Sequence, residues 1–386
     1  MERRWRILLL LLGVRTALGF QFQSVASLQP ILVDAFDVGY AEAGALLGLY
    51  MLPGVVLALP SGAISRWVSD RALVSFGCVL MAAGGIAGGL ADSYELAAAG
   101  RLLAGAGAVV NTIYLAKMVT DWFAGRELPL AMGVLLTSWP VGLAVGELTQ
   151  PSLALAIGWP VVFHLSALFC ALAAAGVWVW YAPPPAGAGG FARGFSIRRH
   201  EALLISLLAG VWLALNAGIV IYLAYVPLRL TETGADLAVA HAVTSSGVWA
   251  MALSIPLGGL LAQRVGRPNL VIGGGAVAGM AAMGLIPFVG WPIPLCIVVG
   301  VAGIAPAAAI MALSAEALRP EARALGMGIF YTWNYIGMMA APAAAGWALD
   351  RTGGSVAPLL VGAGVIGSGA LFLALFRLSQ RWPSRA

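Results

Sequence analysis

The chain consists of long apolar runs separated by short segments that are rich in charged residues, proline and glycine. A membrane helix needs about 20 predominantly apolar residues. The runs are continuously apolar, whereas the strands of a membrane β-barrel alternate between apolar and polar positions. The pattern therefore predicts membrane helices at residues 7–33, 43–64, 72–91, 96–118, 128–150, 155–180, 202–228, 237–262, 269–289, 293–315, 324–348 and 356–376.

The composition excludes the other broad classes of protein. Hydrophobic residues make up 61% of the 386 residues and charged residues only 10%. A soluble domain has about 45–50% apolar and about 25% charged residues. Disordered chains combine low hydrophobicity with high charge, so disorder is excluded as well. We expect an all-α membrane protein with twelve transmembrane helices, embedded in the lipid bilayer as a monomer.

The positions of lysine and arginine predict which side of the membrane each loop faces. Of the 21 Lys and Arg residues, all but four fall in segments that twelve helices and a cytoplasmic N-terminus place inside the cell. We therefore expect a multi-pass protein of the plasma (inner) membrane with both termini in the cytoplasm. The net charge of +5 follows from this distribution and does not indicate nucleic-acid binding.

A Pro- and Gly-rich connection, basic at its end, divides the predicted spans into six and six. The expected domains are an N-terminal six-helix bundle at 1–181, a cytoplasmic linker at 182–200 and a C-terminal six-helix bundle at 201–386. The halves also repeat one another, since Met132-Gly133 recurs 195 positions later as Met327-Gly328. Two related bundles around a site near the middle of the membrane are typical of alternating access, in which one half rocks against the other.

Two stretches resemble the signatures of the major facilitator superfamily. GGLLAQRVGR (258–267) resembles the family's inter-helix loop, and RLLAGAG (101–107) resembles its arginine followed by a glycine-rich run. The chain departs from the loop pattern because Arg66 and Gln263 stand where the family has an acid in each half. The resemblance implies the major facilitator fold of two pseudo-symmetric bundles and secondary active transport. It also implies a weakened or differently built ion-pair latch at these loops.

A second resemblance concerns a branch of that family. SWPVG (138–142), with KM (117–118) and DWF (121–123) upstream, is similar to the cyanate/nitrate-type permeases. This resemblance fixes no substrate.

Ionisable and polar residues inside the spans are the candidates for function, because such groups are costly in lipid. Arg15 lies about nine residues into the first span. It either anchors an anionic substrate through its guanidinium or extends to the cytoplasmic interface. The polar set near the middle of the spans either lines a substrate site or joins helices by hydrogen bonds. The candidate substrate-binding residues are Arg15, Gln23, Asn111, Thr137, Trp139, Asn216, Ser245, Trp249, Tyr331, Trp333 and Asn334.

Asp34, Arg101 and Glu147 are the candidates for proton coupling. Asp34 and Arg101 have comparable predicted depths, and the resemblance to the family's span-four arginine implies a coupling role; the alternative is a static structural pair. Glu147 and His164 also have similar depths and form either a proton relay or two unrelated groups.

The chain has no phosphate-binding Gly-x-x-x-x-Gly-Lys-Ser/Thr loop and no His-Glu-x-x-His or other metal-ligand spacing. We therefore expect no enzyme activity and no cofactor or metal. The function expected is a secondary active transporter that moves a small, organic or inorganic anion by proton symport. The alternatives are an exporter of amphipathic compounds and a transporter-fold sensor that binds a ligand without flux.

Overall fold

The computed structural model describes residues 2–57, 68–123, 127–184, 197–265, 267–319 and 322–381, and the regular structure within these ranges is helical throughout. The first half of the chain contains α1 (Arg3–Ala26), α2 (Gln29–Phe36), α3 (Tyr40–Leu49), α4 (Leu52–Leu57), α6 (Asp70–Gly89), α7 (Tyr94–Phe123), α8 (Leu128–Ile157) and α9 (Pro160–Trp180). The second half contains α10 (Arg199–Glu232), α11 (Leu237–Val265), α12 (Pro268–Leu285), α13 (Ile293–Ile304), α14 (Ala307–Ala317), α15 (Arg323–Thr352) and α16 (Val356–Gln380).

The membrane-spanning character of these helices is confirmed. Ten helical segments among the described residues are long and apolar enough to cross a membrane. The two other predicted spans correspond to the 30-residue helix α15 and to α13 and α14 taken together. The chain thus follows the predicted order of twelve spans.

Three of the predicted spans are each divided into two helices. The first, predicted at 7–33, is divided because α1 ends at Ala26 and Pro30 stands in the first turn of α2. Pro53 stands in the same position in α4, and Pro306 precedes α14. Proline lacks the N–H that a helix interior requires, so a new helix begins beside each of these residues.

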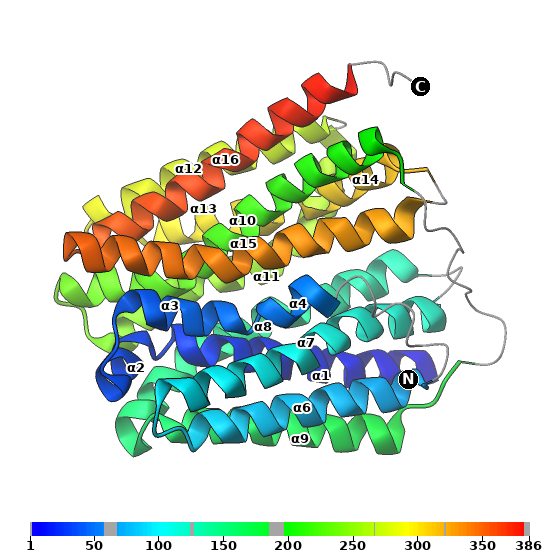
Figure 1. Ribbon diagram of the computed structural model, residues 1–386. Helices are drawn as coiled ribbons and strands as arrows, with labels where there is room; N and C mark the ends of the chain where they lie inside the picture. Colours follow the sequence, from blue (N-terminus) through cyan, green and yellow to red (C-terminus); the bar gives the residue numbers. More distant parts are fainter. Residues whose placement is uncertain are drawn as a thin grey trace.

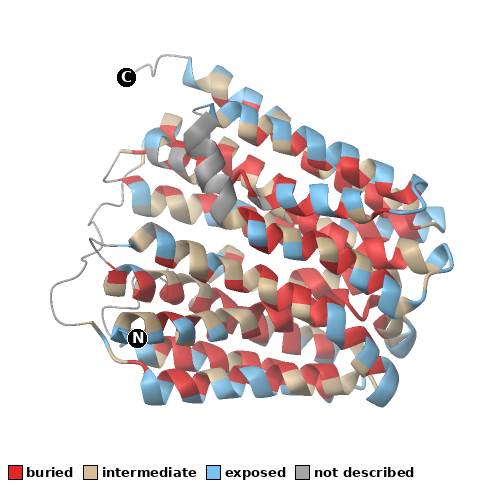
Figure 2. Ribbon diagram, turned by 180° about the vertical axis from the view of Figure 1, so that it is seen from behind, coloured by how far each residue is buried: buried red, intermediate tan, exposed pale blue. Residues whose placement is uncertain are grey.

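The helices form two bundles that lie side by side. Figure 1 shows α1–α9 in the lower part of the molecule and α10–α16 in the upper part, with both chain ends at the same end of the molecule. We call this end the termini end and the opposite end, where α2 lies, the far end. Figure 2 shows that buried residues follow the interior of both bundles, while exposed residues lie on their outer faces.

The two bundles approach one another closely along α3 and α15. Gly44 and Gly48 of α3 lie against the backbone of Pro342 and Met339, and Gly346 makes the equivalent contact from α15. None of these three glycines leaves room for a Cβ atom. The abundance of glycine therefore serves close helix packing here, as in other membrane helices.

A carboxylate joins the two bundles at the far end. Asp350, near the end of α15, accepts hydrogen bonds from the backbone N–H groups of Tyr40 (3.0 Å) and Ala41 (2.8 Å). These are the first two residues of α3, whose N–H groups have no partner within their own helix. One half thus caps a helix of the other.

At the termini end, by contrast, ion pairs join helices of the same half. Lys117 of α7 lies 2.5 Å from the carboxylate of Asp70, at the start of α6. In the other half, Arg319 lies 2.8 Å from Glu201, at the start of α10. Among the described residues at this end, these pairs strengthen each bundle separately.

Several sequence-level expectations fall outside the described residues. Residues 62–67 and 266, the side chains of 256–265, and most of the predicted linker at 182–200 lie there. The loop positions Arg66 and Gln263, and the proposed weakening of a latch at them, are therefore not tested by the structure.

Candidate functional site

Arg15 lies at the boundary between the two bundles. It is half-buried on α1 and interacts electrostatically with the hydroxyl groups of Tyr331 and Tyr335 on α15. Its Nε atom is buried without a hydrogen-bond partner among the described residues. Tyr331 remains 37% exposed although it faces the opposite bundle. The side chains are thus not tightly packed around Arg15, and its guanidinium has unused hydrogen-bonding capacity.

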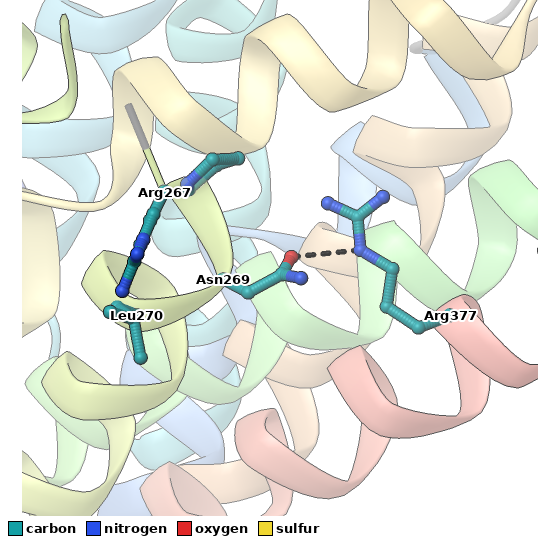
Figure 3. A pocket seen from close by; sticks show the side chains of 5 residues that line it. Arg267, Asn269, Leu270 and Arg377 are labelled. Atoms are coloured by element: carbon teal, nitrogen blue, oxygen red, sulfur yellow. Dashed lines mark hydrogen bonds between the residues drawn. The ribbon is translucent and has the colours of Figure 1, made fainter. Parts of the chain in front are cut away.

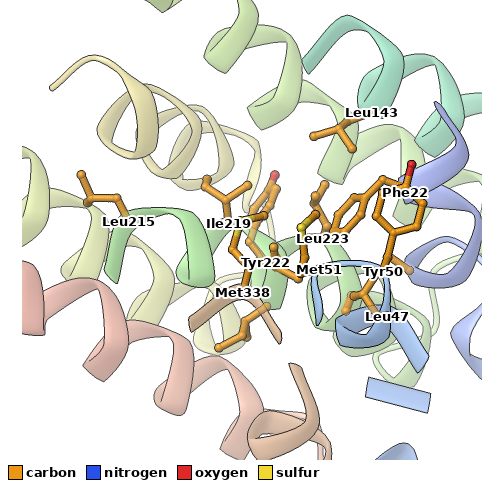
Figure 4. Close-up of a cluster of buried hydrophobic side chains, with 14 of the residues drawn as sticks. Phe22, Leu47, Tyr50, Met51, Leu143, Leu215, Ile219, Tyr222, Leu223 and Met338 are labelled. Atoms are coloured by element: carbon orange, nitrogen blue, oxygen red, sulfur yellow. The ribbon is translucent and has the colours of Figure 1, made fainter. Parts of the chain in front are cut away.

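Apolar side chains close the interface between Arg15 and the far end. Phe22 and Tyr50 of the first half and Tyr222 and Met338 of the second belong to one buried cluster, which Figure 4 shows in close view. Phe22 follows Arg15 by seven residues, or about 10 Å along α1. The cluster therefore separates the surroundings of Arg15 from the far end.

A polar group lies beyond this apolar cluster and is contributed by both halves. Glu147 of α8 has its Oε1 atom 2.7 Å from Nδ1 of His241 on α11. Its other oxygen, Oε2, accepts a hydrogen bond from the side-chain amide of Gln23 on α1. The exposed fractions of these three side chains are 0%, 2% and 0%. The carboxylate is thus held in a dry environment by a hydrogen-bonding residue from each half.

Hydrogen bonds around Gln23 fix this group to the end of α1. The side-chain amide of Gln150 donates to the carbonyl of Phe20 at 2.8 Å and accepts from the hydroxyl of Ser27 at 2.6 Å. Ser27 is also 3.0 Å from the carbonyl of Gln23. These contacts hold α1 and α8 together, so Glu147 moves with the first half.

The partner of Glu147 differs from the sequence-based prediction. The sequence left open whether His164 and Glu147 form a proton relay or are unrelated; the ring of His164 lies on α9 against Gly89 of α6 and is not a hydrogen-bond partner of Glu147. The partner is instead His241, which lies at the far-end side of α11 and was not among the candidate site residues. Depth along single helices matched Glu147 to His164 only and gave no sign of His241.

Arg101 is buried, and its guanidinium is bound to the end of α1. It donates to the carbonyls of Gln21 (3.1 Å) and Phe22 (3.3 Å), and its Cζ atom lies 4.4 Å from the ring centre of Tyr50. Asp34 is exposed on α2. The expected Asp34–Arg101 ion pair is therefore not formed, because backbone carbonyls, which can each accept a second hydrogen bond, take the place of the carboxylate.

Comparison with known proteins identifies the family. The model of the Major Facilitator Superfamily matches residues 9–232 and 208–386, which cover nearly the whole chain. The chain belongs to the Major Facilitator Superfamily. It therefore belongs to a family of membrane transporters rather than of enzymes, and the predicted fold of two pseudo-symmetric six-helix bundles is confirmed.

Two curated relatives are similar to part of this chain. Two uncharacterized MFS-type transporters of Mycobacterium tuberculosis, from strains CDC 1551 / Oshkosh and ATCC 25618 / H37Rv, are 31% identical over 183 residues. This segment is 47% of the chain but only 41% of the length of each relative. The similarity to the cyanate/nitrate-type branch stays a prediction.

Solved structures share the fold over the whole chain. A bacterial homolog of the human lysosomal transporter Spinster, in an inward-facing and occupied conformation, aligns with a TM-score of 0.73 at 17% identity. The same homolog in an inward-facing and unoccupied conformation aligns with a TM-score of 0.69 at 16% identity. Each alignment covers 100% of this chain and 99% of the other.

The glycine-rich signature of this superfamily member has a packing role. RLLAGAG (101–107) places Arg101 against α1, while Gly105 lies against the backbone of Tyr50 and Gly107 against the backbone of Gly77. The motif thus brings α7 close to α3 on one side and to α6 on the other.

Other candidates contact neighbouring helices of their own half. Asn111 is fully buried and donates to the sulfur atoms of Cys78 and Met81 on α6, both at 3.3 Å. Trp333 lies two residues from Tyr331, about 200° around the helix, and its indole donates to Ser206 of α10 at 3.2 Å. The side chains of Asn111 and Trp333 therefore point toward helices of their own half and not toward Arg15.

The remaining candidates have local contacts that assign no role. Thr137 and Asn216 bond to backbone carbonyls of their own helices, and Trp139 packs on Phe22 with ring centres 5.3 Å apart. Ser245 is buried and Trp249 is 38% exposed. Asn334 is buried with a contact to Met338. Substrate binding by Thr137, Trp139, Asn216, Ser245, Trp249 and Asn334 stays a prediction.

A pocket of about 550 Å³ lies at the termini end, at the start of α12 and the end of α16. Figure 3 shows Arg377 of α16 donating to the side chain of Asn269, beside Arg267; this hydrogen bond is 2.8 Å long. The pocket lies within the second half, away from the boundary where Arg15 is found. It contributes positive charge to the termini end.

Proposed function

We propose that this transporter is a secondary active symporter that moves a small anion together with a proton across the plasma (inner) membrane. Arg15 binds the anion, and Glu147 binds the proton. Both termini face the cytoplasm, so the far end faces outward. Alternating access is supported by two bundles that contact each other at the far end, while the described ion pairs at the termini end lie within each half.

The observation that carries the anion proposal is the position of Arg15. It stands twelve residues from the start of α1, about 18 Å along the helix. A charged group at such a depth is costly unless it has a partner. The groups that interact electrostatically with Arg15 among the described residues are two phenols of the other half, Tyr331 and Tyr335. A carboxylate or similar oxyanion would complete the site, since guanidinium binds such groups through two parallel hydrogen bonds.

The conformation also supports access from the cytoplasm to this site. Tyr331 is partly exposed on the termini side of Arg15, while the apolar cluster around Phe22 and Tyr222 closes the far side. The two Spinster-homolog structures that share this fold are described as inward-facing. We infer the same direction of opening for this chain.

A thermal-shift screen of the purified protein tests the anion proposal. Small mono- and dicarboxylates, phosphate, sulfate and nitrate are compared with neutral analogues of matched size. A ligand at one hundred times its Kd stabilises the native state by about 2.7 kcal/mol. We expect at least one anion to raise Tm while its neutral analogue does not.

Variants then assign the effect to Arg15. Arg15→Gln is expected to weaken binding roughly 30-fold, because about 2 kcal/mol is lost with one charged partner. Arg15→Lys should recover part of the affinity through charge alone. Arg199→Gln, an exposed arginine at the termini end, is the matched control and should leave the shift unchanged. Equal affinity in Arg15→Gln and the native protein would refute the assignment.

Flux in liposomes separates the transporter from the alternatives. The anion found in the screen should enter liposomes saturably and faster when a pH gradient is imposed. Binding without flux would support the sensor instead, and a shift caused only by amphipathic compounds would support the exporter. An uptake rate that is the same with and without the pH gradient would refute proton coupling.

A further inference from the structure

Glu147 and His241 come from different halves and meet only while the far end is closed. Glu147 belongs to α8 and is fixed to α1 through Gln23. His241 belongs to α11, four residues from the start of that helix at the far end. A rocking motion that opens the far end separates α8 from α11 and so separates Oε1 of Glu147 from Nδ1 of His241.

The surroundings of this pair contain few groups that could balance its charge. α1 contributes the neutral amide of Gln23, and α10 contributes the phenol of Tyr222, which donates to the carbonyl of Thr244 at 2.6 Å. Behind this phenol, α13 contributes the buried thiol of Cys296. No lysine or arginine is paired with Glu147 among the described residues.

The proton count of the pair therefore depends on whether it is buried. A carboxylate beside a neutral imidazole carries a net negative charge, which is costly in a dry site. One added proton removes this charge, either as carboxylate with imidazolium or as carboxylic acid with imidazole. In water, a histidine side chain loses its proton near pH 6.5 and a glutamate near pH 4.3. Above about pH 6.5 the separated groups therefore hold one proton fewer than the closed pair.

We propose that Glu147 and His241 form one proton-binding site that is shared between the two halves and is filled when the far end closes. The step is balanced: carboxylate, neutral imidazole and one proton combine to give the closed pair. His241 is the positioning residue, since it makes closure possible at a pH where glutamate alone remains ionised. The inference deepens the proposed function, because it rests on alternating access and on Glu147 as the proton carrier.

The site has a specific consequence for the conformational equilibrium. Above about pH 6.5, each further pH unit should lower the ratio of closed to open far ends up to tenfold, because closure takes up one proton. Between about pH 4.5 and 6.5 the separated histidine is already protonated, and the ratio should change little. Acid on the far side thus favours the conformation that opens to the termini end.

Distance measurement by pulsed electron spin resonance tests this site without any solute. Spin labels are attached to Ile157→Cys on α8 and Ala238→Cys on α11, two exposed positions near the far-end termini of these helices. The three native cysteines are buried. In lipid nanodiscs from pH 5 to pH 9, the population with the longer distance should rise above about pH 6.5. A distance distribution that does not change with pH would overturn the proposal.

Variants of the pair separate this site from other titrating groups. Glu147→Gln keeps the side-chain shape without a titrating carboxyl group, so above about pH 6.5 the far end should stay closed instead of opening as in the native protein. His241→Gln leaves Glu147 to bind the proton alone, so the closing transition should move to lower pH. His164→Gln is the matched control and should keep the native profile. A native pH profile in Glu147→Gln or His241→Gln would overturn the proposal.

The outcome is independent of the anion site. The distances are measured without solute, so a failed anion screen leaves this result unaffected. A pH-independent far end, together with anion binding that requires Arg15, would refute the shared proton site and retain the transporter's anion specificity.

Discussion

The carboxylate of Asp350 offers a direct test of how the far end is held closed. Its two oxygens accept the N–H groups of Tyr40 and Ala41, the first residues of α3 in the other half. Asp350→Ala removes both hydrogen bonds and the negative charge at the N-terminus of α3. Opening of the far end breaks the same contacts, so their loss should favour the open conformation.

The magnitude follows from known values for helix capping. Loss of an N-cap side chain costs about 1 kcal/mol, and a charge at a helix terminus adds about 0.3–1 kcal/mol. Asp350 is exposed, so the lower part of each range applies. We expect a change of about 1.5 kcal/mol, which lowers the ratio of closed to open far ends roughly tenfold.

The label pair at positions 157 and 238 provides the assay, at a fixed pH of 7. The ratio of the longer-distance to the shorter-distance population should rise about tenfold in Asp350→Ala. Asp92→Ala, an exposed carboxylate of the first half at the same end, is the control and should have no effect. An unchanged distribution in Asp350→Ala, or an equal change in Asp92→Ala, would refute the capping argument.

Two further predictions concern packing. Gly48→Ala places a methyl group against the backbone of Met339. This overlap costs about 1–3 kcal/mol and should favour the longer distance between the two spin labels. An unchanged distance distribution would show that α3 and α15 have room to adjust. Arg101→Gln removes the hydrogen bonds to the carbonyls of Gln21 and Phe22. The free energy of unfolding should fall by about 2–4 kcal/mol, which is measured as a lower Tm in detergent. An unchanged Tm would show that these bonds add no net stability.

The order of the helices could be predicted from the sequence because lipid imposes a strong constraint. Every span must be apolar and about 20 residues long, and both properties are visible in single segments. The breaks were not predicted, because proline has no fixed effect. Pro30 and Pro306 stand beside breaks, whereas Pro140 and Pro151 lie inside α8. Neighbouring helices and side chains decide whether the freed carbonyl is satisfied.

The candidate site could be predicted only in part, for a different reason. Glu147, Arg101 and Arg15 were recognised because a charged residue inside a span is rare and costly. Their partners lie on other helices, and no property of α8 indicates that His241, 94 residues away, faces it. Which helices meet across the two halves depends on the whole fold. The partners of Arg101 could not be predicted either, because they are backbone carbonyls, which every residue has.

The far-end contacts are weak individually, and this weakness suits a transporter that must visit both conformations. A ligand or proton can shift an equilibrium only by its differential affinity for the two states, so the states must differ by a few kcal/mol. The loss of Asp350 is worth about 1.5 kcal/mol by the capping argument, and one pH unit at a proton-binding site is worth 1.36 kcal/mol. These contacts join different helix pairs, α3 with α15 and α8 with α11, so their effects should add. Asp350→Ala at pH 7 should therefore resemble the native protein at about pH 8, and acidification to about pH 6 should restore part of the closed population, because the separated histidine is already protonated below about pH 6.5. A variant whose far end stays open on acidification would show that the two contacts do not act on one common motion.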